Sequence, residues 1–527
     1  MFTQISLARS ILRLAEADAD RLAVVVEEHR YSRADVAEDA GRLAAALVGA
    51  GVGPGDRVAV MRRNAALHLV ATIACSWIGA IVVPLNFRLP AAEAAGIIAD
   101  CTPKVVICGP LHAEEWDADL PQGTGDARWV VDDLDPIAGQ PPRLSTRWTP
   151  LSSLRSGAGP TPDPVVPDPG SELMILYTSG STGYPKGVRL THRNVWASWA
   201  NMTEALPITP QDVTLAVAPF SHVGGINTFT LQAVVEGGTV VVQRRFDVHQ
   251  GLLQIEEHRV NSTFGVPAMY RAMSLDPAFD TTDLSSLRVL LAGGAPAPTD
   301  LVATFRRRGL PLTVSWGMTE TTGGGTVLRL ADADTHPGSV GTPNLNTEVL
   351  IADYGTDAPI TKPGRVGELL VRGANVTPGY WGRAPEAFLP DGWFRSGDFA
   401  MRDAEGFVYL MGRSQEVIIS GGENIYPAEI ENHLAEHPAV ADVAVVGVPD
   451  LEWGETPLAF VVPRDPQAPP ELAELRDFLT PVLARFKLPR RLRIMPVLPH
   501  GPTGKVDRAA LRALVSSDPP SDTTKDT

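Results

Sequence analysis

The sequence has 527 residues, a formal net charge of −16 and 44% hydrophobic residues. This length predicts several domains rather than one core. The acidic balance, with a sequence pI near 5.2, argues against a nucleic-acid-binding protein, which needs a basic patch or stripe, and likewise against a role on a membrane surface.

The cysteines and the N-terminal residues indicate the cellular compartment of the protein. The three cysteines, Cys75, Cys101 and Cys108, show no metal-like pairing, and their odd count favours a reducing compartment. The first residues lack a basic region followed by a long apolar core, so no secretory signal is expected. These features predict a cytoplasmic protein.

Residues 20–170 alternate short β-branched runs, as at 22–27 and 57–61, with amphipathic stretches, which predicts βαβ units around a parallel sheet. Ser32 followed by Asp35 predicts a helix start. Residues 65–85 are almost uncharged and long enough to cross a bilayer. Because Gly79 and Pro84 interrupt them, we interpret the stretch as a buried helix followed by a short strand rather than a membrane span.

An apolar run leads into Tyr-Thr-Ser-Gly-Ser-Thr-Gly-Tyr-Pro-Lys-Gly at residues 177–187. Glycines let the backbone turn its N–H groups toward an anion, hydroxyls add donors and a lysine adds positive charge. The composition predicts a phosphate-binding loop, with a flexible Gly/Ser loop as the alternative. The P-loop spacing is excluded because the lysine precedes the last glycine. The candidate residues are Thr178, Ser179, Gly180, Ser181, Thr182, Gly183, Lys186 and Gly187.

A helix is expected over residues 190–204, and three later strands are expected to end in glycine-containing segments. These segments are Phe-Ser-His-Val-Gly-Gly at 220–225, Gly-Gly-Ala-Pro at 293–296 and Trp-Gly-Met-Thr-Glu-Thr at 316–321. Open α/β sheets bind ligands at the carboxyl ends of their strands, so all three are candidate binding segments. Taken alone, His222 is more often a structural histidine and Trp316 more often a core residue.

The sequence becomes more β-rich after residue 336, as in a small barrel-like subdomain. Asp398 follows a Ser-Gly turn, where an Asp is usually only a turn residue. The remainder, including a helix-like stretch at 471–485, predicts a compact α+β unit. Lys505 would ordinarily be a solvated side chain, and residues 516–527 predict a disordered tail.

In this order, and over essentially the whole chain, these motifs resemble those of the adenylate-forming superfamily, in its acyl-CoA synthetase or acid:CoA ligase branch. The resemblance implies an α/β fold with a large N-terminal adenylation domain over residues 1–412, which combines layered βαβ sheets with a small β-barrel-like subdomain. It further implies a hinge at 413–415, a smaller mobile α+β C-terminal lid domain over 416–515 and a disordered tail over 516–527.

The resemblance also implies a role for each matching position around the nucleotide. The loop residues and Lys186 would bind phosphate, Thr319 would bind the α-phosphate, and Glu320 would hold a Mg²⁺ that bridges phosphate oxygens. Trp316 would stack on the adenine. The adenine would also meet Gly293, Gly294, Ala295, Pro296, Gly317 and Met318. Asp398 would chelate both ribose hydroxyls, and Arg413 would support the ribose or a phosphate.

The remaining implied roles concern the acid, coenzyme A and the second domain. Lys505 would reach into the active site for the first half-reaction, and Gly421 and Gly422 would admit the pantetheine arm of coenzyme A. His222 would form part of the acid pocket, near the carboxylate, rather than act as a general base. The other pocket positions are Val223, Asn227, Phe264, Gly293, Gly317, Met318, Thr322 and Gly323. This small and apolar set permits an aryl or a short to medium alkyl acid, and its lack of Arg and Lys disfavours a dicarboxylate.

The hinge departs from the family pattern, because Gln415 stands where the family usually has Asp or Lys. The next residue, Glu416, keeps the acidic character common there. Gln415 retains hydrogen bonding but loses charge, so the relative stability of the two domain positions stays open.

The implied activity is ATP-dependent acid:CoA ligation: a carboxylic acid is activated as acyl-AMP with release of pyrophosphate and then forms the acyl-CoA thioester, with ATP, Mg²⁺ and coenzyme A required. Such a reaction depends on position and charge, and the sequence shows no Ser-His-Asp, paired-carboxylate or metal-ligand cluster. An alternative passes the acyl group to an amine, a carrier protein or another nucleophile. A non-catalytic nucleotide-binding protein is disfavoured, because every catalytic position is filled. The partners expected are small molecules, without nucleic acid or a membrane span; the acid and the oligomeric state, with a homodimer among the options, stay open.

Overall fold

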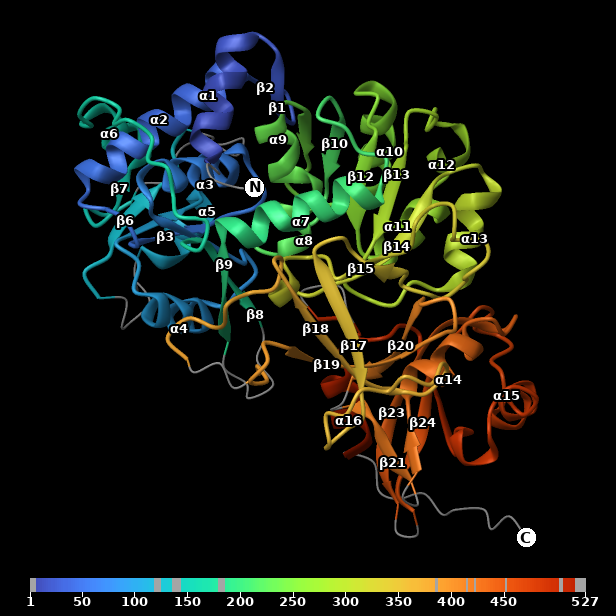
Figure 1. Cartoon of the computed structure of the whole chain (residues 1–527). Coiled ribbons are helices and arrows are strands. Elements are labelled where there is room, and N and C mark those ends of the chain that lie inside the picture. Colours follow the sequence, from blue (N-terminus) through green and yellow to red (C-terminus); the bar gives the residue numbers. More distant parts are fainter. Residues whose placement is uncertain are drawn as a thin grey trace.

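The computed structural model describes residues 6–117, 125–134, 144–178, 185–383, 387–413, 416–420, 423–450, 453–501 and 506–516. Two large sheets with their helices form the N-terminal part, drawn from blue to yellow-green in Figure 1. A smaller unit, drawn in orange and red, adjoins it. The protein thus has the expected α/β fold with a large N-terminal and a smaller C-terminal domain.

A seven-stranded sheet forms the first half of the N-terminal domain. Its strands are parallel except for the edge strand β9, which forms an antiparallel hairpin with β8. All five residues of β4 are buried, as expected of a parallel strand covered on both faces. Along the sheet the order is β7 (Thr149–Pro150), β6 (Arg128–Val131), β5 (Val105–Cys108), β3 (Arg57–Met61), β4 (Ile81–Leu85), β8 (Glu172–Thr178) and β9 (Lys186–Thr191).

A nine-stranded sheet forms the second half. Residues 20–170, expected to form βαβ units with parallel sheet, supply strands to both large sheets: β1 pairs in parallel with β11, with Val24 opposite Val240. Pairing between strands so far apart leaves no local trace in the sequence. The order is β16 (Thr342–Pro343), β15 (Thr326–Val327), β14 (Leu312–Trp316), β13 (Val289–Ala292), β12 (Ser262–Gly265), β10 (Val213–Ala216), β11 (Thr239–Val242), β1 (Leu22–Val26) and β2 (His29–Ser32).

Two antiparallel sheets follow in the β-rich part and the C-terminal domain. The four-stranded sheet takes the place of the expected barrel-like subdomain, in the order β17 (Thr347–Ala352), β18 (Gly367–Gly373), β19 (Phe394–Arg402) and β20 (Val408–Arg413). The last sheet runs β22 (Glu423–Ile425), β21 (Ile418–Ser420), β24 (Gly454–Pro463) and β23 (Val440–Asp450), with β25 (Arg491–Ile494) paired in parallel to β24.

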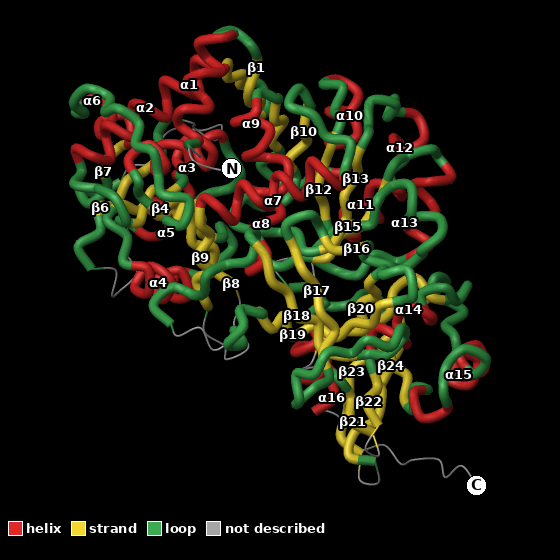
Figure 2. The backbone as a smooth tube through the Cα atoms, viewed as in Figure 1, coloured by secondary structure: helices red, strands yellow, loops and turns green. Residues whose placement is uncertain are grey.

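Helices lie around these sheets (Figure 2). In the N-terminal half of the chain they are α1 (Leu7–Ala17), α2 (Arg33–Gly49), α3 (Ala66–Ile78), α4 (Ala91–Cys101), α5 (Pro110–Trp116), α6 (Leu151–Ser156), α7 (His192–Ala205), α8 (Val223–Ile226), α9 (Gln232–Glu236) and α10 (Val248–Glu257). The later ones are α11 (Pro267–Leu275), α12 (Ala278–Thr281), α13 (Thr299–Arg307), α14 (Pro427–Leu434), α15 (Leu472–Leu479) and α16 (Arg508–Ser516). A π-helical turn, η1 (Asn227–Leu231), and 3-10 turns η2 (Thr319–Thr321) and η4 (Arg485–Lys487) complete them.

Local signals account for several helix ends. Ser32 caps α2 by accepting a hydrogen bond from the Asp35 amide, while the Asp35 carboxylate accepts from the Ser32 amide, so the predicted start is confirmed. The helix expected over residues 190–204 begins later, at His192, because the preceding residues pair with β8. The helix-like stretch at 471–485 ends at Leu479, because Pro481 has no backbone N–H with which to continue the helical hydrogen bonds.

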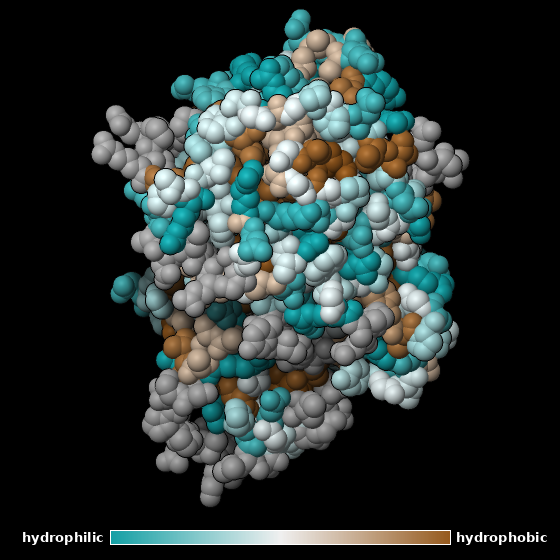
Figure 3. Space-filling view, turned by 90° about the vertical axis from the view of Figure 1, so that its left-hand side faces the viewer, coloured by the Kyte–Doolittle hydropathy of each residue, from teal (hydrophilic) through white to brown (hydrophobic). Residues whose placement is uncertain are grey.

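The nearly uncharged stretch at residues 65–85 is core, as predicted. Every residue of α3 is buried, and Gly79 ends the helix in the left-handed conformation at φ 72° before β4 begins. Among the described residues, no helix combines the length and the apolar character that a bilayer crossing requires. Cys75, Cys101 and Cys108 are all buried as free thiols. On the face seen in Figure 3, apolar side chains gather in separate patches among hydrophilic ones.

Candidate functional site

The hairpin of β8 and β9 frames the glycine-rich loop predicted to bind phosphate. Thr178 and Lys186 face each other at the end of the hairpin next to that loop, and the Thr178 hydroxyl lies 3.5 Å from the Lys186 carbonyl oxygen. Gly187 allows close packing here, because a Cβ atom there would lie 2.8 Å from Ile175 Cγ2. The predicted loop residues Ser179, Gly180, Ser181, Thr182 and Gly183 lie outside the described part of the chain.

Two adjacent strands of the nine-stranded sheet, β13 and β14, end at the segments predicted to meet the nucleotide. After β13 come Gly293, which is buried, and Gly294, Ala295 and Pro296, which are half-buried or exposed. After β14, the chain passes through Gly317 and Met318 into η2, which carries Thr319 and Glu320. Both segments lie at carboxyl ends of parallel strands, where ligands bind in open α/β sheets.

Trp316 and Asp398 meet although they lie on different sheets and are 82 positions apart. The indole N–H of Trp316 donates to Asp398 Oδ2 at 2.7 Å, and both side chains are buried. Asp398 stands opposite Arg413 in the β19–β20 register, although the Arg413 side chain lies outside what the structure describes. The residues predicted to bind adenine and ribose are therefore in direct contact.

Glu320 and Lys186 both contact Tyr380. The Tyr380 hydroxyl donates to Glu320 Oε1 at 2.9 Å, and Lys186 Nζ lies 5.6 Å from the centre of the Tyr380 ring. Glu320 is 6% exposed. Burial, and then the neighbouring Glu320 charge, raises the pKa of Tyr380 above its ordinary value, so the phenol stays a proton donor.

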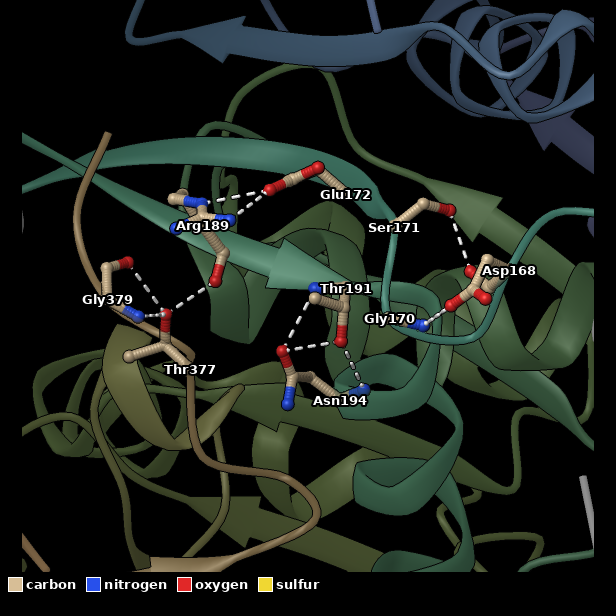
Figure 4. Close-up of polar contacts among 9 residues, drawn as sticks. All are labelled: Asp168, Gly170, Ser171, Glu172, Arg189, Thr191, Asn194, Thr377 and Gly379. Atoms are coloured by element: carbon tan, nitrogen blue, oxygen red, sulfur yellow. Dashed lines mark hydrogen bonds and ion pairs between the residues drawn. The ribbon is translucent and has the colours of Figure 1, made fainter. Parts of the chain in front are cut away.

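Residues 374–381, which we call the bridging segment, connect the hairpin to η2. On the hairpin side, the Thr377 hydroxyl donates to the carbonyl oxygens of Arg189 and Gly379 at 2.5 and 2.9 Å (Figure 4). On the η2 side, the Thr377 amide donates to the Glu320 carbonyl oxygen at 2.8 Å. Figure 4 also shows the Arg189–Glu172 ion pair, which joins β9 to β8. The bridging segment therefore fixes the hairpin relative to η2.

A buried amide network holds the same turn from the other side. Asn375 donates to the carbonyl oxygens of Thr321 and Gly324 at 3.1 and 2.7 Å, and Asn227 donates to that of Thr322 at 2.9 Å. Both asparagines are fully buried. Thr322 has φ 56°, a left-handed conformation that costs energy for a non-glycine residue. The amides stabilise this turn because they satisfy its buried carbonyl groups.

The predicted acid pocket lies between α8 and strands β12 and β13. The half-buried Phe264 ring packs between two glycines: a Cβ atom would lie 2.3 Å from the ring at Gly224 and 3.0 Å from it at Gly293. Beside the ring is a gap with no room for a water molecule, lined in part by Thr228. Val223 and Thr228 also lie next to Gly323, so these pocket residues gather in one place. His222 is half-buried at the start of α8.

Several predicted residues cannot be placed. Gln415, Gly421, Gly422 and Lys505 lie outside the described ranges, as do Ser179 through Gly183. Within those ranges, no group of three or more His, Cys, Asp or Glu side chains could hold a metal ion. A single buried carboxylate such as Glu320 fits Mg²⁺, because this ion keeps several waters and takes further oxygen ligands from the phosphates of a nucleotide.

Sequence reasoning missed the residues that position the site. Tyr380, Thr377, Asn375 and Asn194 lie in or against the bridging segment; Asn194 donates to the carbonyl oxygens of Ala374 and Val376 at 2.9 and 2.8 Å. The one available signal was the polar and turn-forming sequence Asn-Val-Thr-Pro-Gly-Tyr at 375–380 directly after an apolar strand. That signal predicts a turn but names no partner for it.

Comparison with known proteins extends over the whole chain. The family model of the AMP-binding enzyme matches residues 12–381, and that of the AMP-binding enzyme C-terminal domain matches residues 429–505. The chain is 40% identical to a feruloyl-CoA synthase from Amycolatopsis over 91% of its length and 93% of the relative. It is 37% identical to an indoleacetate–CoA ligase from Aromatoleum aromaticum, over 97% and 98% of the two chains. The structure of o-succinylbenzoate coenzyme A synthetase from Bacillus subtilis with ATP and magnesium ion matches with a TM-score of 0.81 and 29% identity, over 96% and 99% of the two chains.

Proposed function

Because the chain belongs to the AMP-binding enzyme family, we propose that it is an ATP-dependent acid:CoA ligase. A carboxylate oxygen of the acid attacks the α-phosphorus of ATP, which forms the acyl-adenylate and releases pyrophosphate. The coenzyme A thiol then attacks the acyl carbon and releases AMP. The observation that carries this proposal is the convergence of three sheets on residues 316–320, which contact Asp398 from one side and Tyr380, beside Lys186, from the other.

Each described residue has a proposed task in the first step. Trp316 packs against the adenine, and Asp398, oriented by the Trp316 indole, accepts hydrogen bonds from the ribose hydroxyls. Lys186 and the Thr319 hydroxyl bind phosphate oxygens, and Glu320 holds Mg²⁺. The ion, when bound, supplies positive charge to the phosphate oxygens. Catalysis then comes from position and charge, as is usual for displacement at phosphorus.

For the acid we propose an aromatic or aryl-substituted carboxylic acid. Two relatives are named for feruloyl and indoleacetate substrates, which both carry a flat ring. In this chain the Phe264 ring lies between Gly224 and Gly293, so the pocket wall offers an aromatic face beside bare backbone. A flat acid can stack on such a face, while a second carboxylate would find no Arg or Lys among the predicted pocket residues.

We also propose that the protein is cytoplasmic. The three buried free thiols agree with this location.

The experiment that tests the function is a release assay for pyrophosphate and AMP with purified protein, ATP and Mg²⁺, over a panel of aryl acids and C2–C16 alkyl acids, with and without coenzyme A. We expect acid-dependent AMP release that rises sharply with coenzyme A and is greatest for an aryl acid. Adenylation that is indifferent to coenzyme A would instead identify a ligase with another acceptor, which the uncharged Gln415 at the expected hinge permits. No acid-dependent pyrophosphate release across the panel would refute both.

The pocket assignment makes a separate prediction. Phe264→Ala removes the ring that fills the space between the two glycines, so the variant should accept larger acids and bind the best aryl acid at least about fivefold more weakly. The same acid panel, read as kcat/KM, measures this change. Phe279→Ala is a matched control, because Phe279 is buried in the core against Phe305 and should affect stability without changing the order of acids. An unchanged order in Phe264→Ala would contradict the assignment.

A further inference from the structure

Tyr380 contacts both charged groups at the phosphate end of the proposed site. Its hydroxyl donates to Glu320 Oε1 at 2.9 Å, and its ring lies 5.6 Å from Lys186 Nζ. Lys186 lies on β9 and Glu320 on the η2 turn, and the two residues are joined here by one side chain from a third segment. Such a tyrosine could serve only to pack a surface turn. Here, however, its hydroxyl contacts Glu320 and its ring contacts Lys186, and both of these residues have proposed functional roles.

The backbone around Tyr380 is fixed on both sides. Tyr380 forms a β-bridge with Val188, the Trp381 amide donates to the Gly187 carbonyl oxygen at 2.7 Å, and the Arg189 amide donates to that of Gly379 at 3.1 Å. These contacts extend the sheet edge at β9 by one short strand-like step. The phenol therefore has a position that is set by the hairpin carrying Lys186, whereas its hydrogen bond sets the position of a carboxylate on η2.

The chemistry of the contact favours orientation over reaction. A phenol that donates to a carboxylate holds one of its oxygens and so restricts rotation of the carboxylate plane. The ring face provides a favourable place for the Lys186 ammonium, since a cation within about 6 Å of a ring centre is attracted to it.

We propose that Tyr380 is a positioning residue for metal–nucleotide binding: its hydroxyl orients the Glu320 carboxylate toward Mg²⁺, and its ring holds the Lys186 side chain near the phosphates. The proposal rests on the proposed function, which supplies the ion and the nucleotide. It assigns Tyr380 no direct contact with the reacting atoms. The hydroxyl and the ring thus have separable tasks.

The test uses Tyr380→Phe, which removes only the hydroxyl, and Tyr380→Leu, which also removes the ring. Tyr409→Phe is the matched control, because the Tyr409 hydroxyl also donates to a carboxylate, that of Asp403, at 3.3 Å. Binding of Mn²⁺ in place of Mg²⁺ is measured by electron paramagnetic resonance with ATP present and no acid. The adenylation rate is then measured against Mg²⁺ and ATP concentrations.

We expect Tyr380→Phe to weaken Mn²⁺ binding and to raise the half-saturating Mg²⁺ concentration by about tenfold, the size of one hydrogen bond to a charged group. Its kcat at saturating Mg²⁺ should stay within about threefold of wild type, while Tyr380→Leu should raise the KM for ATP as well. Tyr409→Phe should leave all three quantities unchanged. Unchanged metal dependence in Tyr380→Phe, or a loss of kcat alone, would overturn the proposal. Because Mn²⁺ binding needs no acid, it separates this outcome from failure of the proposed ligase activity, which would appear as wild-type protein inactive on every acid.

Discussion

At the scale of single residues, the indole N–H of Trp316 donates a hydrogen bond to the buried carboxylate of Asp398. Trp316→Phe keeps an aromatic face for the adenine but removes this donor, so we expect ATP to bind about tenfold more weakly, corresponding to about 1.4 kcal/mol. Isothermal titration with ATP and Mg²⁺ measures the change. Trp393→Phe serves as the control, because the half-buried Trp393 ring lies against the Arg372 guanidinium. Equal affinities for Trp316→Phe and wild type would show that the bond does not orient Asp398.

Two buried histidines make stability depend on pH. Burial, and then the Arg62 charge, lowers the pKa of His68 to about 3, and burial lowers the pKa of His192 to about 4. Both groups bind a proton in the unfolded chain below about pH 6.5 but resist it when folded, so their contribution is complete above that pH and is lost as the pH falls toward 4 and 3. In this window each histidine lowers the free energy of unfolding by up to about 1.4 kcal/mol per pH unit.

His68→Gln should therefore flatten the decline in the free energy of unfolding between pH 6.5 and 4.5. Urea unfolding at a series of pH values measures the slope of the free energy of unfolding against pH. This slope does not depend on how much stability the variant loses at neutral pH. His29→Gln is the control, since His29 is exposed on β2 and its replacement should leave the slope unchanged. An identical slope in His68→Gln and wild type would show that His68 is protonated in the folded protein.

At the scale of elements, the bridging segment connects two sheets and the turn that carries Glu320. Asn375→Ala removes the donors to the carbonyl oxygens of Thr321 and Gly324 and the acceptor for the Thr347 hydroxyl. Leaving buried polar groups without partners costs roughly 1–3 kcal/mol each, so we expect a loss of at least about 2 kcal/mol in the free energy of unfolding. We also expect adenylation to slow by at least about tenfold, because the turn bearing Thr319 and Glu320 loses its support.

Asn261→Ala is the matched control for this variant. Asn261 accepts from the Val213 amide and donates to the Ser286 carbonyl oxygen. These contacts lie at the amino-terminal ends of β10 and β12. The Asn261→Ala variant should therefore reduce stability without slowing adenylation at a temperature where the protein is folded. Urea unfolding and the pyrophosphate assay separate the two effects. If both variants lost activity in proportion to stability, the bridging segment would have no specific part in the site.

The elements also differ in whether the sequence alone predicts them. Elements set by local chemistry were predictable: the Ser32–Asp35 cap, and the break at Gly79 between α3 and β4. Elements set by distant partners were not, as β1 on β11 and the extension of β9 along β8 demonstrate. In the site, the resemblance named Trp316, Glu320 and Asp398 individually. Their contacts to one another and to Tyr380 span 60 to 82 positions, so they required the folded chain.

At the scale of the whole molecule, the C-terminal domain has its own core, and described side chains of this domain contact the rest of the protein. Tyr426 packs against Phe399 with ring centres 5.5 Å apart, and Thr299 donates to Glu436 at 3.4 Å. Within the domain, Arg508 at the start of α16 pairs with Glu431 at 2.7 Å. This pair anchors the helix that directly follows the segment of Lys505.

Lys505 lies on that domain in the sequence, and we expect it to serve only the first half-reaction. Lys505→Ala should lower acyl-adenylate formation by at least about a hundredfold, since it removes a charge that would stabilise developing oxyanions. Conversion of a supplied acyl-adenylate to the thioester should stay within about threefold of wild type. Single-turnover assays of each half-reaction measure the split. Lys362→Ala, at an exposed position between β17 and β18, should change neither rate, and equal losses in both half-reactions of Lys505→Ala would contradict the assignment.

The burial of all three cysteines has a practical consequence for such assays. Burial raises the pKa of the Cys101 thiol to about 12 and also raises those of Cys75 and Cys108, so in the folded protein none presents a thiolate near neutral pH. A chromogenic disulfide reagent added to aliquots withdrawn from the reaction mixture will therefore report the free thiol of coenzyme A and not the protein. The fall in colour from one aliquot to the next then follows thioester formation, and a slow gain of three thiols per chain would signal unfolding during the assay.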